Sequence, residues 1–104
     1  MSKREINLRS DTKQVLVKMG KNVRKARLRR NLSAEFIAKQ ASISTDTLLS
    51  IEKGASTVSI GAYAAVLAVL ELDKDLQLVA LDEDGKKQFW EQNLYPRERA
   101  SKKK

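Results

Sequence analysis

The chain has 104 residues, of which 41% are hydrophobic and 5% aromatic, so it fits one small domain with an aliphatic core. It contains no Cys and no His, which excludes disulfides, Cys-based zinc sites and histidine catalysis. No apolar run approaches the roughly 20 residues of a membrane span, and the N-terminus lacks the apolar centre of a secretory signal. We therefore expect a cytoplasmic protein.

The net charge of +8 is unevenly distributed along the chain. Residues 1–70 carry 13 Lys and Arg against 5 Asp and Glu, a net of +8. Residues 71–84 carry one Lys against six acids (−5), residues 85–95 carry +1, and residues 96–104 carry +4. Such an excess favours a polyanionic partner through counterion release, although a basic surface also serves solubility alone.

A long first helix is expected after a basic arm formed by residues 1–10. Ser10 or Asp11 is the predicted N-cap. Gly20 marks a candidate break within this helix, and the Asn31-Leu32 pair ends it. The apolar residues Val15, Met19, Val23 and Ala26 recur at steps of three and four, as on the inner face of a helix, and Leu28 follows them.

The next stretch predicts two short helices joined by a tight turn, at about 34–40 and 45–52. Ser33 and Ser44 are placed to cap them, because a Ser hydroxyl accepts a hydrogen bond from a free first-turn N–H. Gly54 fits a left-handed position that closes the second of these helices. The start of that helix exposes small polar side chains suited to base edges: Thr45, Asp46, Thr47 and Ser50.

A fourth helix is predicted from Ile60 to about Glu71, capped by Ser59. Its Ala-rich face fits either core packing or a dimer seam. The run 76–81 fits a strand by alternation and a helix by spacing, and Asp73 as a cap favours a helix. A sixth helix is expected from Lys86 to about Asn93, with apolar residues at Phe89 and Trp90.

Catalytic chemistry has little support in this sequence. There is no Gly-rich phosphate loop and no cluster with metal-ligand spacing. The adjacent carboxylates of Asp82, Glu83 and Asp84 fit an exposed acidic linker. We expect no enzyme activity, no catalytic residues, no metal and no cofactor.

The stretch from about Met19 to Leu72 resembles the Cro and phage-repressor type of helix-turn-helix domain, also called the XRE family. The matching positions are Gly20, Val23, Arg27, Leu32-Ser33, Ile37-Ala38, Ile43-Ser44, Leu48, Ile51-Glu52, Gly54, Ser59-Ile60 and the helix at Leu67 to Leu70. This resemblance implies an all-α, five-helix lambda-repressor-like bundle. It also implies a homodimer on a palindromic double-stranded DNA operator, and an internal ion pair between Arg27 and Glu52.

The resemblance assigns DNA-contacting roles to eight positions. The start of the second helix, Ser33 and Ala34, should lie against a phosphate. Phosphate contacts are also implied for Thr47 and Lys53. The base-reading or groove-facing positions are Ser44, Thr45, Asp46 and Ser50.

Four positions depart from the family pattern. Ala34 stands where the family often has Gln, and Asp46 where an amide is usual, so Asp46 suits cytosine N4 better than a phosphate. Ser42 occupies the usual Gly position of the turn, which requires left-handed dihedrals of a Ser. Val58 replaces a Pro in the following loop.

The C-terminal part is similar to the tail of HipB-like antitoxins, the operon partners of HipA-type Ser/Thr kinase toxins. The similarity rests on three segments: Leu72-Asp-Lys-Asp-Leu76, Leu81-Asp-Glu-Asp-Gly85-Lys-Lys, and Leu94-Tyr-Pro-Arg-Glu-Arg. It implies an autoregulating antitoxin, with Phe89 and Trp90 as candidate toxin or dimer contacts, or alternatively as packing residues of their own helix. A repressor without a toxin partner and a protein-interaction adaptor with weak DNA binding remain alternatives.

The predicted organisation has four parts. An N-terminal arm (1–10) precedes the helix-turn-helix domain (11–72). A C-terminal helical extension (73–95) follows for dimer or partner contacts, and a disordered basic tail (96–104) ends the chain.

Overall fold

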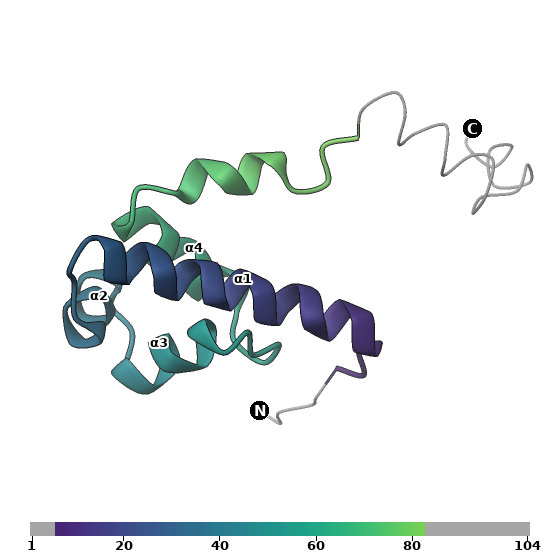
Figure 1. Ribbon diagram of the computed structural model, residues 1–104, viewed down its shortest axis with the longest axis horizontal. Coiled ribbons are helices and arrows are strands. Elements are labelled where there is room, and N and C mark those ends of the chain that lie inside the picture. Colours follow the sequence, from purple (N-terminus) through teal and green to yellow (C-terminus); the bar gives the residue numbers. More distant parts are fainter. Residues whose placement is uncertain (1–5, 83–104) are drawn as a thin grey trace, which may run out of the picture.

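The computed structural model describes residues 6–82, which form a bundle of helices without strands (Figure 1). This confirms the predicted all-α, five-helix class. The elements in chain order are α1 (Ser10–Arg29), α2 (Ala34–Ala41), α3 (Thr45–Glu52), α4 (Ile60–Val69) and a 3₁₀ helix, η1 (Asp73–Leu78). The predicted sixth helix, with Phe89 and Trp90, and the basic tail lie outside the described residues.

Helix α1 is continuous through Gly20, so the candidate break at this residue was wrong. The predicted cap was also wrong: the N-cap is Arg9, whose side chain makes no capping hydrogen bond, and Ser10 already belongs to the helix. The first turns of α1 extend past the other helices (Figure 1). Val15, predicted on the inner face, is therefore 65% exposed. Val23 and Ala26, further along the helix, are buried as predicted.

The next three helices begin at serine caps, as their sequences predicted. Ser33, Ser44 and Ser59 have extended backbone, and each side chain accepts from a first-turn N–H. The donors are the backbone N–H groups of Phe36, Thr47 and Ala62, at 3.0, 3.0 and 3.1 Å. Each cap satisfies one of the free donors that every helix start carries.

Two left-handed residues set the turns on either side of α3. Ser42 ends α2 with φ 62° and ψ 40°, so it adopts the conformation expected of the residue in place of the family Gly. Gly54 follows α3 with φ 80°, as predicted for a residue that closes a helix. The chain therefore turns sharply into and out of α3.

The segment after α4 differs from the predicted helix over 76–81. Helix α4 ends at Val69, Glu71 has φ 65°, and the chain then forms the 3₁₀ helix η1 without a capping bond from Asp73. Leu76 packs against the core, while the apolar residues that follow it are exposed. Without a continuous buried stripe, tertiary packing gives no support to a longer α-helix here.

The core lies between the four α-helices and is aliphatic, as the composition predicted. Five side chains are fully buried: Ile37, Leu48, Ile51, Val66 and Leu70. Burying one such side chain stabilises the fold by about 1.5–3 kcal/mol. Within the described residues, no helix is long and apolar enough to cross a bilayer.

Candidate nucleic-acid interface

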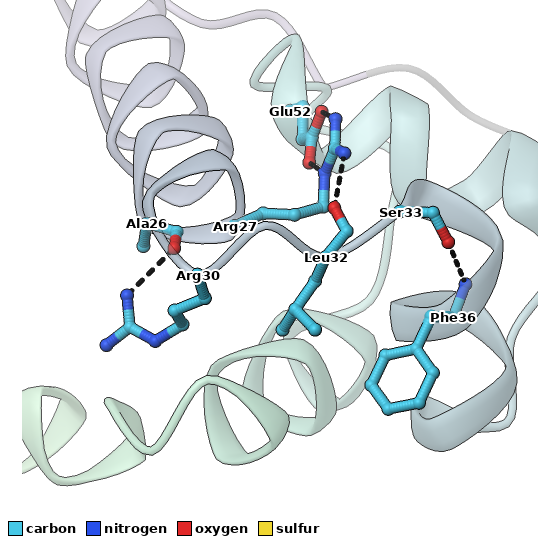
Figure 2. A network of polar contacts seen from close by, with 7 residues as sticks. All are labelled: Ala26, Arg27, Arg30, Leu32, Ser33, Phe36 and Glu52. Atoms are coloured by element: carbon cyan, nitrogen blue, oxygen red, sulfur yellow. Dashed lines mark hydrogen bonds and ion pairs between the residues drawn. The ribbon is translucent and has the colours of Figure 1, made fainter.

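A buried ion pair fixes the end of α3 to α1 (Figure 2). The Arg27 Nε donates to Glu52 Oε2 at 2.6 Å, and its Nη2 donates to Oε1 at 3.0 Å. The third donor, Nη1, bonds the Leu32 carbonyl at 3.0 Å. The hydrogen bond to Glu52 raises the pKa of the Arg27 guanidinium above its ordinary value, against the opposing effect of burial. One guanidinium thus ties together α1, α3 and the connection to α2.

Two glycines let the backbones of α1 and α3 approach closely. A Cβ at Gly20 would lie 2.6 Å from the carbonyl oxygens of Ile51 and Glu52, and 2.7 Å from the backbone nitrogen of Gly54. A Cβ at Gly54 would meet the backbone of Leu16 in the same way. Only glycine fits at these contacts, so the two residues set the distance between the helices.

The loop after α3 is held by a tyrosine from α4. The Tyr63 hydroxyl donates to the Ala55 carbonyl at 2.6 Å, and the residue is only 7% exposed. Burial raises the pKa of Tyr63 above its ordinary value, because the phenolate would lose its hydration. Both ends of α3 are therefore anchored, one by its serine cap and one by Arg27, Gly20 and Tyr63.

The eight sequence-predicted contact residues all reach the surface of the bundle. Ser33, Ser44, Asp46 and Lys53 are exposed, and Ala34, Thr45, Thr47 and Ser50 are half-buried. The hydroxyls of Ser44 and Thr47 lie 2.9 Å apart, and Ser44 also caps α3. These two hydroxyls are already engaged with each other, whereas no such bond occupies Thr45, Asp46 or Ser50 within the described residues.

The outward face of α3 includes a residue that sequence reasoning missed. Positions three, four and seven residues apart share one face of a helix, and this face carries Asp46, Leu49, Ser50 and Lys53. Leu49 is 40% exposed. The sequence contains the signal for this exposure. Leu48 and Ile51 define the core face of α3, and Leu49 lies about 100° around the helix from Leu48, away from that face.

The start of α2 presents a second group of residues. Ser33 caps this helix, and Phe36, one turn later, is 45% exposed (Figure 2). The free N–H groups and the positive end of the helix dipole are found here, an arrangement that suits a phosphate oxygen. Glu35 lies in the same turn and contributes an opposing charge.

Together, α2, the turn at Ser42 and α3 have the geometry of a helix-turn-helix motif, in which the second helix enters the major groove of DNA. The comparison with protein families agrees: the model of the helix-turn-helix domain matches residues 18–79. The chain belongs to this family of DNA-binding domains. No curated protein and no solved structure shows a significant match to the chain.

Proposed function

We propose that this protein is a dimeric, sequence-specific transcriptional repressor that acts in the cytoplasm on a palindromic operator. The observation that carries this proposal is the exposed polar face of α3, held rigidly by the Arg27–Glu52 pair and by two backbone contacts. A recognition helix must be fixed relative to its scaffold, because base contacts tolerate little displacement.

In this proposal α3 reads bases and its surroundings contact the backbone. Thr45 and Ser50 donate to base edges, and the Asp46 carboxylate accepts from cytosine N4. Leu49 contacts a thymine methyl group, since it is the one apolar side chain on the face. Phosphates are contacted by the backbone N–H groups at Ala34 and by the side chains of Ser33, Thr47 and Lys53. Ser44 positions the start of α3.

Substitutions on α3 test these roles with two duplexes, the protein's own promoter and a scrambled sequence. Thr45→Ala and Ser50→Ala should each weaken promoter binding about 5- to 150-fold, equivalent to about 1–3 kcal/mol of base discrimination. Lys53→Ala should weaken both duplexes alike, because a phosphate contact carries no sequence information. Fluorescence anisotropy titrations measure each affinity. Equal losses on both duplexes for Thr45→Ala would contradict the assigned role.

Dimeric binding is proposed because one α3 offers only a few base contacts. Two half-sites would be separated by about 34 Å, one turn of the duplex. Inserting 5 base pairs between the half-sites should abolish high-affinity binding, because the two recognition helices then face opposite sides. Unchanged affinity for this duplex would contradict symmetric dimer binding.

We further propose a HipB-like antitoxin role, in which the protein represses its own operon and binds a HipA-type kinase. The similarity of the three C-terminal segments supports this role, and Phe89 and Trp90 are the proposed kinase contacts. The test is a pull-down with the product of the neighbouring gene. Capture of a kinase-fold protein, lost in Phe89→Ala/Trp90→Ala, would support the role. Operator binding without such a partner would favour a phage- or plasmid-type repressor, and absence of salt-sensitive specific binding would favour an adaptor.

A further inference from the structure

Helix α1 carries a row of cations on its outer face that neither the ion pair nor the α3 contacts use. We call this row the α1 ridge; its members are Lys18, Lys21, Lys25 and Arg29, and all four are exposed. Gln14 and Asn22 line the same surface as Lys18, Lys21 and Lys25. Among the described residues, the ion pairs join only Arg9 to Asp11 and Arg27 to Glu52, so no acidic side chain there neutralises the ridge.

The ridge faces away from the recognition helix. The α1 residues in contact with the end of α3 are Leu16, Val17, Gly20 and Arg27. Residues advance by about 100° around an α-helix, so the centre of the ridge lies roughly 145° around the axis from these contacts. The ridge therefore lies on the side of α1 opposite its contacts with the end of α3.

The chemistry of the ridge fits the backbone of a nucleic acid better than a protein surface. Its cations are spread over twelve residues, and the first and last lie about 16 Å apart along the helix axis, which corresponds to about five nucleotides of one strand. It contains no aromatic side chain, and the apolar residues beside it are Val15, Val17 and Leu28, whereas the centres of protein interfaces are enriched in aromatic residues and depleted of Lys. Lysine binds phosphate as a point charge, without sequence preference.

We propose that the α1 ridge is a second DNA-binding surface that holds the phosphates of another duplex while α3 occupies the operator. That α3 occupies an operator rests on the proposed repressor function. That the ridge binds DNA does not rest on it, because ridge binding requires only the charge and exposure of the ridge residues. A protein bound in this way would bridge two DNA segments.

A bridging assay with a matched pair of variants tests the proposal. The operator duplex is fixed to beads and loaded with protein, and a labelled random-sequence duplex is then added in excess. The wild-type chain should retain the labelled duplex, and Lys21→Gln/Lys25→Gln should lose most of it. Lys13→Gln/Lys74→Gln, which removes two exposed charges outside the ridge, should behave as wild type.

Salt dependence gives a second readout with the random duplex alone. Each lost phosphate contact lowers the slope of log K against log salt by about 0.9, so the ridge variant should lose about 1.8 and the control almost none. Thermal melts check that both variants remain folded, as expected for exposed substitutions. Lys18→Gln/Arg29→Gln is an independent ridge variant that should repeat the result.

The outcomes separate this proposal from the repressor function. Equal retention of the labelled duplex by wild type and both ridge variants would overturn the second surface, as would operator binding with no retention at all. A ridge variant that lost self-association instead of the second duplex would assign the ridge to a protein contact and also overturn it. Ridge-dependent binding of random DNA without operator preference would keep the ridge and reject the repressor.

Discussion

The Arg27–Glu52 pair has a large effect on stability only because both groups are buried. The side chains of Arg27 and Glu52 are 10% and 3% exposed, so each charge is stabilised by the other and not by hydration. Arg27→Met should destabilise the domain by about 3–5 kcal/mol, because it leaves the Glu52 carboxylate buried without a partner. Urea unfolding followed by circular dichroism measures this loss.

Two further variants distinguish the cost of an orphaned charge from the cost of lost packing. Arg27→Met/Glu52→Leu should regain a large part of the stability, since no charge is then left unpaired. Arg24→Met, on the exposed side of the same helix, should change stability by less than about 0.5 kcal/mol. Equal losses for the single and the double variant would indicate that packing alone explains the effect.

Ionisation of Tyr63 should lower the folding stability of the domain at alkaline pH. Burial raises the folded-state pKa above the ordinary value of 10.0, so the unfolded chain releases this proton first as the pH rises. The stability is therefore complete below about pH 10 and falls above it, by at most about 1.4 kcal/mol per pH unit for one proton. Tyr63→Phe should flatten this part of the pH profile.

The same substitution should cost about 1 kcal/mol at neutral pH, because the Ala55 carbonyl loses its hydrogen bond. Urea unfolding at several values between pH 7 and pH 11 measures both effects. The quantity to compare is the difference between the pH profiles of the wild type and Tyr63→Phe. Parallel profiles would show that Tyr63 ionises equally in both states.

At the scale of the helices, the serine caps separate stability from DNA binding. Ser44 and Ser59 make the same capping bond, at 3.0 and 3.1 Å, but only Ser44 begins α3. Ser44→Ala and Ser59→Ala should each cost about 1 kcal/mol of folding stability. Only Ser44→Ala should also weaken promoter binding, as measured by anisotropy well below the melting temperature. Equal promoter affinity in the two variants would show that Ser44 is not part of the DNA interface.

Local signals in the sequence were enough to predict most of these elements. A Ser before an apolar run fixed three helix starts, and Gly54 fixed the end of α3, because each acts through hydrogen bonds or dihedrals of its own neighbours. The pairing of Arg27 with Glu52 and the contact role of Gly20 depend on residues far apart in the chain. The first became visible only through the family resemblance, and the second only through the packed backbones.

Two of the errors have the same physical origin. Val15 has the helical period of a core residue, but the first turns of α1 extend past the helices that would otherwise cover it. The run after Leu72 has helical spacing, but it lacks a surface on which Leu78 and Val79 are buried. Tertiary packing, which short-range patterns do not contain, decided both cases. Leu49 is different, because its angular offset from Leu48 is a local signal that the sequence contains.

For the whole molecule, the described core suggests that the helix-turn-helix unit folds without residues 83–104. The buried cluster and the residues packed against it run from Met19 to Leu76, and the family match ends at residue 79. We therefore expect the chain shortened to 1–82 to unfold cooperatively, with a midpoint temperature within a few degrees of the full chain. Calorimetry measures this comparison, and a loss above about 2 kcal/mol would place part of the core beyond residue 82.

The shortened chain also tests the proposed division of labour. Residues 83–104 contain seven Lys and Arg against four Asp and Glu, so their removal takes away three net positive charges. Binding to random DNA should become weaker and less salt-dependent, while the preference for the promoter over a scrambled duplex should persist, because α3 is intact. Capture of the proposed HipA-type kinase should be lost, since the proposed contacts Phe89 and Trp90 are removed. A shortened chain that lost promoter preference but kept its fold would place the dimer contact, and hence the operator symmetry, in the C-terminal segment.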